Sequence, residues 1–479
     1  MVAEAERCVK CGRGVTISKI SRTLRGPGKT KPILLPMKAL RSTVVCSWLL
    51  RLLALAVTVS LAACTGPAPT TGPQPVGTTP APSAKVTPTH AAATGPAATT
   101  ATAPALATLR IWLPPDFAPS GTALGSDVLA AQLAQFQQAH PTLTLEVRVK
   151  AASGTGGLLH SLAAAYNVAP AILPNVIALN EEDLASAAAA GLVIPLDTFF
   201  PGQTLEDYYP VAQTISRQEG GERVGLPFAA DALVAVYNAS FYATSPLTWT
   251  SVTTGTFIFP GGDLTALTVL DEYVALGGTL ADNTGKLALK VDLVAKALSF
   301  FRSARDIGIL PLSTLAYTDP AASWQGFRDG RATLAVTSAR QFLSDYEHVS
   351  SAAGTLIPAP DGKPLALARG WSWAIVNTEP ERHADAAALL TWLTDPAQLS
   401  AWTRAAAVLP TRSSVLAGWP SSPRAVFAGE VMARAQLKPA DAVLAKIGPP
   451  LQQALADVLN DRATPASAAA TAVQALEKP

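Results

Sequence analysis

The segment 108–149 changes its hydrophobic period twice, and this change constrains the fold more than any other feature of the chain. Residues 109–113 read Leu-Arg-Ile-Trp-Leu, and residues 143–149 read Leu-Thr-Leu-Glu-Val-Arg-Val, both typical of strands. Between them, apolar side chains recur on one helical face, at Leu129, Leu133 and Phe136. A strand, a helix and a second strand form the unit of a parallel sheet covered by helices. The sequence therefore predicts an α/β fold.

The same alternation continues along the chain. Residues 156–166 predict a helix and residues 175–179 a short buried strand. Asn180 is placed to cap the next helix, and Gly191 to end it. Residues 384–393 predict a later helix, and Asp395 followed by Pro396 predicts the start of another. The 372 residues from 108 to 479 exceed one ordinary domain, so we expect two lobes.

Cys64 ends a feature of a different kind. The 12 residues 52–63 are uncharged and mostly apolar, too few for a spanning helix, which needs roughly 20. Lys38, Arg41 and Arg51 form a positive flank before this run, as in a secretory signal. Leu-Ala-Ala-Cys at 61–64 resembles the bacterial lipobox, which implies lipidation of Cys64. We expect a signal peptide at 37–63 and a protein anchored by lipid to the extracytoplasmic face of the cell membrane.

Residues 1–36 then resemble an over-extended gene start, with Met37 as the natural first residue. They contain Cys8 and Cys11, a pair that lacks the further cysteine or histidine ligands usual in zinc sites. No cysteine follows Cys64, so we expect neither disulfides nor thiol chemistry beyond it, and no metal or cofactor.

The positive net charge also belongs to the start of the chain. Residues 1–63 hold 11 of the 36 Lys and Arg residues but 2 of the 34 Asp and Glu residues. The rest of the chain therefore has 25 Lys and Arg residues and 32 Asp and Glu residues, a formal charge of −7. This negative charge argues against a nucleic-acid partner. Residues 64–107 consist mainly of Thr, Pro, Ala and Gly and lack the large apolar groups that would offset the entropy of ordering. We expect them to form an extended spacer between the lipid and the folded part.

Five motifs in the folded part occur in an order that resembles one family. They are Leu133 to Pro141, Gly225-Leu-Pro-Phe228 with Tyr237-Asn238, Trp324-x2-Phe327-x2-Gly330, Gly370-Trp-Ser-Trp-Ala-Ile375, and Leu409-Pro-Thr-Arg412. Together they resemble the bacterial extracellular solute-binding proteins of the sugar-binding type (family 1), over about residues 108–420.

The resemblance implies a periplasmic-binding-protein-like fold, in which two α/β lobes are joined by a hinge with a ligand cleft between them. It also implies a monomer that delivers a mono- or oligosaccharide to the permease of an ABC importer. We expect lobe 1 at about 108–222 and 330–372, and lobe 2 at about 223–329 and 373–479.

Aromatic faces suit the C–H faces of a sugar, so the tryptophans are the first candidates for ligand contacts. Trp371 and Trp373 are two apart on a predicted strand and should face the same side, either as a cleft wall or under the helices of a lobe. Trp324 lies before a helix-to-strand turn where the family places an aromatic near the ligand, with packing in the core as the alternative. Trp112 follows the start of the first strand, whose carboxyl end should line the cleft.

Polar candidates complete the predicted ligand site. Asp231 interrupts the apolar run 228–236, where an uncompensated carboxylate would be costly to bury, so it either pairs with a base or opens onto a wet cleft. Tyr237 is a further candidate, with strand packing as the alternative. Arg369, beside Trp371, leaves open an anionic ligand such as an acidic sugar.

Other functions have less support. The same fold binding an anion, a polyamine or a peptide remains an alternative. A secreted hydrolase is disfavoured, because neither H-E-x-x-H nor G-x-S-x-G occurs. Tyr208-Tyr209 resembles the tyrosine pairs that bind ferric iron in distant relatives, but it runs into Pro210, which favours a structural loop.

Overall fold

The computed structural model describes residues 106–201, 205–217, 221–282, 284–360 and 363–476. The chain divides into two units, Met1–Ala97 and Ala98–Pro479, and all described residues belong to the second. The expected signal peptide, Cys64 and almost all of the expected spacer lie outside the described residues, so their predictions remain predictions. Among the described residues, no helix has the length and apolar character needed to cross a bilayer.

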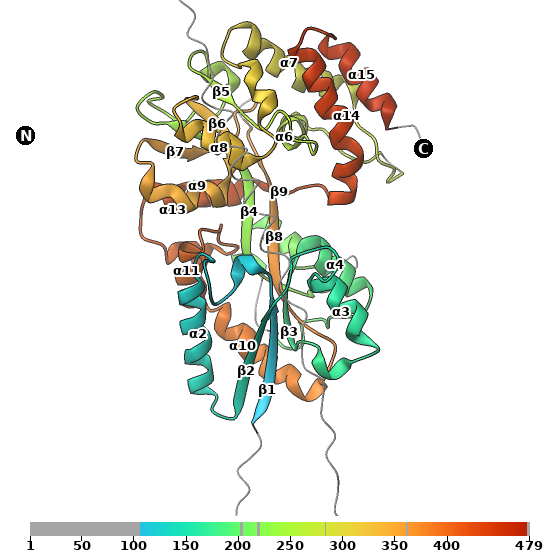
Figure 1. Ribbon diagram of the computed structural model, residues 1–479, viewed down its shortest axis with the longest axis vertical. Helices are drawn as coiled ribbons and strands as arrows, with labels where there is room; N and C mark the ends of the chain where they lie inside the picture. Colours follow the sequence, from blue (N-terminus) through green and yellow to red (C-terminus); the bar gives the residue numbers. More distant parts are fainter. Residues whose placement is uncertain (1–105, 202–204, 218–220, 283, 361–362, 477–479) are drawn as a thin grey trace, which may run out of the picture. The chain divides into compact units, whose positions relative to one another are not determined.

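One mixed sheet organises the described part of the chain (Figure 1). Its main path runs in the order β2-β1-β3-β8-β4-β6-β5, with β7 beside β4 and β9 beside β8. The strands are β1 (Ala107–Leu113), β2 (Leu143–Val149), β3 (Val176–Asn180), β4 (Leu226–Asn238), β5 (Phe257–Ile258), β6 (Leu334–Ser338), β7 (Ala352–Thr355), β8 (Ala366–Ile375) and β9 (Ala435–Leu437). β1 is parallel to both β2 and β3, which confirms the predicted strand-helix-strand unit.

Helices cover this sheet and account for most of the remaining chain. They are α2 (Ser126–Ala139), α3 (Leu158–Tyr166), α4 (Glu181–Ala189), α5 (Pro210–Ile215), α6 (Leu267–Ala275), α7 (Val291–Asp306), α8 (Pro320–Arg328), α9 (Ala339–Asp345), α10 (His383–Leu393), α11 (Pro396–Ala405), α12 (Ser413–Ala417), α13 (Pro423–Arg434), α14 (Asp441–Leu459) and α15 (Pro465–Ala475).

Local signals in the sequence predicted several of these elements correctly. The three apolar positions of α2 are buried, and the helix ends just before His140-Pro141. The Asn180 side chain accepts a hydrogen bond from the Asp183 amide at 2.8 Å and so caps α4. Asp395 caps α11 in the same way, by accepting from the Ala397 amide at 2.9 Å.

Two groups of elements form separate cores, as expected of two lobes. Lobe 1 contains β1–β3, α2–α4, α10 and α11, and its core joins residues such as Ile111, Phe136 and Leu390. Lobe 2 contains β5–β7, α6–α9 and α13–α15, and its core joins residues such as Phe259 and Leu455. The long strands β4 and β8 run from one group to the other (Figure 1) and pair antiparallel where they cross.

The predicted lobe boundaries need correction. Residues 330–372 were expected in lobe 1, but β6 pairs with β5 and β4, and its Leu334 and Val336 belong to the core of lobe 2. Residues 373–479 were expected in lobe 2, but α10 and α11 pack in lobe 1. Over the described residues, the chain passes between the two groups of elements three times, and the first passage is β4. The second passage is β8 itself, and the third follows α12. The end of the second lobe 1 segment could not be predicted, because it depends on the pairing of β8 with strands far away in the sequence.

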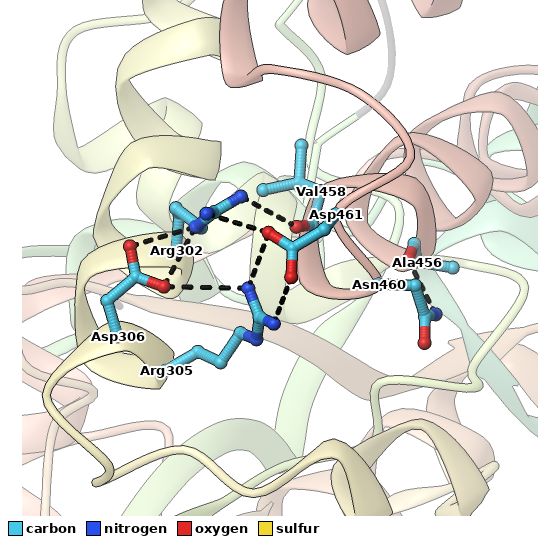
Figure 2. Close-up of polar contacts among 7 residues, drawn as sticks. All are labelled: Arg302, Arg305, Asp306, Ala456, Val458, Asn460 and Asp461. Carbon is cyan, nitrogen blue, oxygen red and sulfur yellow. Dashed lines mark hydrogen bonds and ion pairs between the residues drawn. The ribbon is translucent and has the colours of Figure 1, made fainter.

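An ion-pair cluster joins α7 to the end of α14 (Figure 2). Asp461 follows α14 and accepts from Arg302 at 2.7 Å and from both terminal nitrogens of Arg305. Arg302 also binds Asp306 one turn further along α7, at 2.8 Å. These ion pairs connect the two helices. Because they lie at the surface of lobe 2, each adds little to the free energy of unfolding.

Two adjacent carboxyl groups are buried inside lobe 2. Asp271 and Glu272 on α6 are 2% and 0% exposed, and one oxygen of each has no hydrogen-bond partner within the described part of the chain. Burial raises the pKa of both groups well above their ordinary values of 3.8 and 4.5, and the Asp271 charge raises the pKa of Glu272 further. A hydrogen bond from the Trp249 indole N–H at 2.9 Å offsets only part of this for Glu272.

The buried acids predict a pH dependence of stability. Because their pKa values are higher in the folded than in the unfolded chain, the folded state binds more protons, and stability falls as the pH rises above about 4. We expect Asp271→Asn to raise the melting temperature relative to the native protein, with a gain that grows between pH 4 and pH 8. Differential scanning calorimetry across this range measures the effect.

Asp127→Asn is the matched control, because Asp127 is exposed on α2. A gain for Asp271→Asn that is the same at every pH, or no larger than the control's, would contradict the prediction.

Candidate functional site

A cavity of about 260 Å³ lies where the crossing strands meet lobe 2. β4 and β8 form its floor, and lobe 2 supplies its walls. Its lining residues are Asp231, Ala232, Leu233, Thr265, Leu267, Pro320, Ser338, Leu367, Arg369, Lys438, Asp441 and Leu444. Because both crossing strands line it, a ligand here would contact the segments that connect the lobes.

Asp231 and Arg369 occupy the floor of this pocket side by side. They are register partners on β4 and β8. One oxygen of Asp231 accepts from the backbone amides of Ala232 and Arg340, each at 2.9 Å, and its other oxygen has no hydrogen-bond partner among the described residues. Arg369 is exposed and forms no hydrogen bond or ion pair with any residue that the structure describes. The floor therefore presents one free carboxylate oxygen and one free guanidinium group.

Arg340 connects this floor to lobe 1. Its backbone amide binds Asp231, while its guanidinium group lies 3.4 Å from the Asp116 carboxylate and donates to the Asp116 carbonyl at 3.3 Å. Asp116 belongs to the short 3-10 helix Pro115–Phe117 that follows β1. The guanidinium group also lies 5.6 Å from the centre of the Phe117 ring. One residue thus contacts the pocket carboxylate and the opposite lobe.

Glu182 of α4 makes a second connection from lobe 1. Its carboxylate accepts from Lys438 Nζ at 2.8 Å and from the Asp441 amide at 2.9 and 3.0 Å, at the start of α14. Lys438 also donates to the Asp441 carboxylate at 2.7 Å. Burial alone would lower the pKa of Lys438, but the hydrogen bonds with Asp441 and Glu182 raise it on balance. Lys438 is therefore a cation whose charge the protein already compensates.

The neighbouring Glu181 holds β8 at the same junction. One of its carboxylate oxygens accepts from the Gly370 amide at 3.0 Å. Burial raises the pKa of Glu181, and hydrogen bonds from backbone amides, including that of Gly370, oppose this shift. The start of α4 therefore contacts both β8 and α14, which belong to the crossing and to lobe 2.

The apolar part of the pocket is aliphatic. Leu233, Leu267, Leu367 and Leu444 supply side chains from β4, α6, β8 and α14. No aromatic residue is among the residues that line this cavity. The expected aromatic wall is absent from the lining of this pocket.

Trp371 and Trp373 face the same side of β8, as their spacing predicts, but they pack inside lobe 1. Trp373 stacks on Phe228 with ring centres 4.6 Å apart, and Trp371 meets the edge of Phe117 at 5.3 Å. Their side chains belong to the lobe 1 core, at 8% and 3% exposure for Trp371 and Trp373. The structure therefore places both in the core rather than in the lining of the pocket.

The other aromatic candidates also lie away from this pocket. Trp112 is buried in lobe 1, with Lys150 Nζ 4.4 Å from its ring centre. Trp324 is buried in lobe 2, where its indole N–H donates to Asp345 at 2.7 Å. Tyr237 lies near the end of β4 and lines a different cavity of about 390 Å³ in lobe 2. Of the seven predicted ligand residues, the structure brings Asp231 and Arg369 together.

Sequence reasoning missed most of the pocket. Thr265, Ser338, Lys438 and Asp441 carry no motif that separates them from ordinary loop and cap residues. The three acids that begin α4 were a visible signal, since Asn180 was correctly predicted to cap that helix. Acids in a first helical turn are common, so this signal alone does not predict that Glu182 reaches lobe 2.

Other features of the described residues are weaker candidates for a ligand site than this pocket. A cavity of about 470 Å³ is larger, but it touches neither β4 nor Asp231 and is lined mainly by α6 and the segment 363–365. The described residues contain no cluster of three or more His, Cys, Asp or Glu side chains suited to a metal ion. Tyr208 is buried, with the Arg412 guanidinium group 5.2 Å from its ring centre, which fits the structural interpretation of the tyrosine pair.

Solved structures share this architecture. The chain is similar to the maltose-bound MalE3 of T. maritima, with a TM-score of 0.58 and 20% identity, covering 78% of this chain and 99% of that one. It is similar to the cyclic alpha-maltosyl-1,6-maltose binding protein from Arthrobacter globiformis, with a TM-score of 0.62, 20% identity and coverages of 78% and 98%. It is also similar to the sugar-binding protein MalE of Xanthomonas citri, with a TM-score of 0.63 and 16% identity, covering 78% of this chain and 98% of that one. At these identities the likeness establishes the fold.

Sequence comparison establishes the family. No curated protein matches this chain significantly. Residues 131–427, more than half of the chain, match the model of a bacterial extracellular solute-binding protein. With the two-lobed α/β fold and the pocket at the crossing strands, this match shows that the chain belongs to the bacterial extracellular solute-binding protein family.

Proposed function

We propose that this chain is a lipid-anchored binding protein that captures a small carbohydrate outside the cytoplasm and delivers it to the permease of an ABC importer. Lipid on Cys64 would hold it to the membrane, and residues 65–107 would act as the spacer. It would act as a monomer and would release its solute chemically unchanged.

The pocket at the crossing of β4 and β8 carries this proposal. A hydroxyl-rich solute needs acceptors and donors that the protein does not already use, and the pocket floor offers Asp231 and Arg369. The contacts of Glu182 and Asp116 with lobe 2 border the same region, so movement of the lobes would change access to it. The sugars named for the similar structures support a carbohydrate as the solute class.

A hydrolase is the alternative function. Two carboxylates line the pocket, Asp231 and Asp441, but Asp441 is bound by Lys438, whereas glycosidases usually need a pair of carboxyl groups that act on the bond from either side. Release of chromophore from chromogenic glycosides by the purified chain would support this alternative and would contradict our proposal.

Carbohydrate binding can be measured by thermal shift of the full chain in detergent against mono- and oligosaccharides. A ligand at 100 times its Kd should stabilise the folded state by about 2.7 kcal/mol, so at least one carbohydrate should raise the melting temperature. Asp231→Asn keeps an acceptor for the Ala232 and Arg340 amides but loses the free carboxylate oxygen, and it should weaken binding about tenfold or more. Asp329→Asn, in lobe 2 outside the pocket, is the matched control. If no carbohydrate changes the melting temperature, the carbohydrate assignment is wrong.

Contact between the lobes predicts a second result. Glu182→Gln removes the charge that binds Lys438 and should cost the joined arrangement about 1 kcal/mol, roughly a fivefold shift toward separated lobes. Small-angle X-ray scattering should show a larger radius of gyration for the variant without ligand. Glu381→Gln, an exposed change in the same lobe, should match the native protein. Identical scattering from all three proteins would mean that Glu182 does not restrain the lobes.

Lipidation predicts a third result. In a bacterial host, metabolic labelling with a fatty-acid analogue should mark the native chain, and Cys64→Ser should remove the label and release the protein from the membrane fraction. Cys46→Ser, within the expected signal peptide, should keep the label. Label retained by Cys64→Ser would reject the anchor.

A further inference from the structure

The charges around the pocket floor are unequally compensated. Lys438 binds two carboxylates, and Arg340 binds Asp116. Arg369, the third cation of this region, has no carboxylate within ion-pair distance among the described residues, although its register partner is an aspartate. The protein therefore leaves one guanidinium group of the pocket available.

The acids of the same region do not supply its missing partner. Glu182 and Asp441 share Lys438, and Glu181 binds the Gly370 amide. Asp231 uses one oxygen to accept from two backbone amides and keeps the other free. All four carboxylates thus already accept at least one hydrogen bond, and two of them share the Lys438 cation, which reduces their repulsion toward an anionic group at Arg369.

Because the pocket lining is aliphatic, polar contacts must supply most of the affinity for a sugar. Without an aromatic face in the pocket, a sugar cannot stack there, and its polar contacts carry more of the affinity. Hydrogen bonds to charged groups are roughly twice as strong as those between neutral groups. A guanidinium group can also donate two parallel hydrogen bonds to the two oxygens of a carboxylate, whereas a hydroxyl offers it one oxygen.

We propose that the pocket selects a sugar acid, a small carbohydrate that carries a carboxylate group. Its carboxylate binds Arg369, a hydroxyl donates to the free oxygen of Asp231, and the C–H face of the sugar lies against the leucines of the lining. A volume of about 260 Å³ falls just below the range of drug-sized sites, which favours a single sugar unit. This inference rests on the proposed carbohydrate function and names its ligand class.

Isothermal titration calorimetry of the full chain in detergent tests this assignment with matched pairs. Glucuronate and galacturonate are compared with glucose and galactose, which differ from them by the carboxylate. We expect the native protein to bind at least one of the two acids ten times or more tightly than its neutral partner. Glucose 6-phosphate tests whether a phosphate group serves instead.

Substitution of Arg369 makes the test specific to the residue. Arg369→Gln should weaken binding of the sugar acid about ten- to a hundredfold and should weaken binding of the neutral sugars far less, because they lose a hydrogen bond rather than an ion pair. Arg369→Lys keeps the charge without the planar fork and should restore part of the affinity. Arg331→Gln, an exposed arginine of lobe 2 outside the pocket, is the matched control and should bind like the native protein. Equal melting temperatures of the ligand-free proteins would show that the variants are folded.

The outcomes separate this inference from the broader proposal. Tighter binding of the neutral sugars, or affinity for the acids that is independent of Arg369, would overturn the sugar-acid assignment and leave carbohydrate binding intact. Tighter binding of glucose 6-phosphate than of either uronate would overturn the carboxylate as the recognised group. If none of the five compounds binds, and the wider carbohydrate screen also fails, both the inference and the proposed function are wrong.

Discussion

Antiparallel pairing between β4 and β8 is the interaction on which the rest of the structure depends. These strands belong to both lobes, and their register puts Asp231 opposite Arg369. A strand has a side-chain period of two, so a slip of one strand by one residue would put Asp231 and Arg369 on opposite faces of the sheet. Backbone hydrogen bonds far from either side chain therefore determine whether a polar floor exists.

The two lobes meet this floor through charged groups at the starts of short elements. Glu182 lies in the first turn of α4 and accepts from the first amide of α14, where unpaired N–H groups favour an anion. Ser338 caps α9 at the pocket, and Asp231 accepts from an amide of the same first turn. Helix termini thus both line the candidate pocket and form contact points between the lobes. Such contacts are weak individually, which is compatible with the proposed movement of the lobes.

Local physics explains which parts of this structure could be predicted from the sequence. The period of residues 109–149, the Asn180 cap and the Asp395 cap depend on neighbours within a few positions, and all three are confirmed. The sequence singles out Asp231 because a lone carboxylate in an apolar strand requires either a partner or solvent, and the structure places it at the pocket. The positions of the tryptophans could not be predicted, because burial in a core and exposure in a cleft favour the same side chain. Lys438 and Glu182 are 256 residues apart, and no local pattern reports a contact of that range.

Arg340 contacts the pocket and the opposite lobe through different parts of the residue. Its contact with Asp231 uses the backbone amide, which every residue except proline retains, whereas its contact with Asp116 uses the side chain. Substitution at this one position can therefore alter how strongly the lobes adhere while the acceptor in the pocket stays oriented. The strength of the contact between the lobes and the orientation of the pocket carboxylate are therefore separable, although one residue contributes to both.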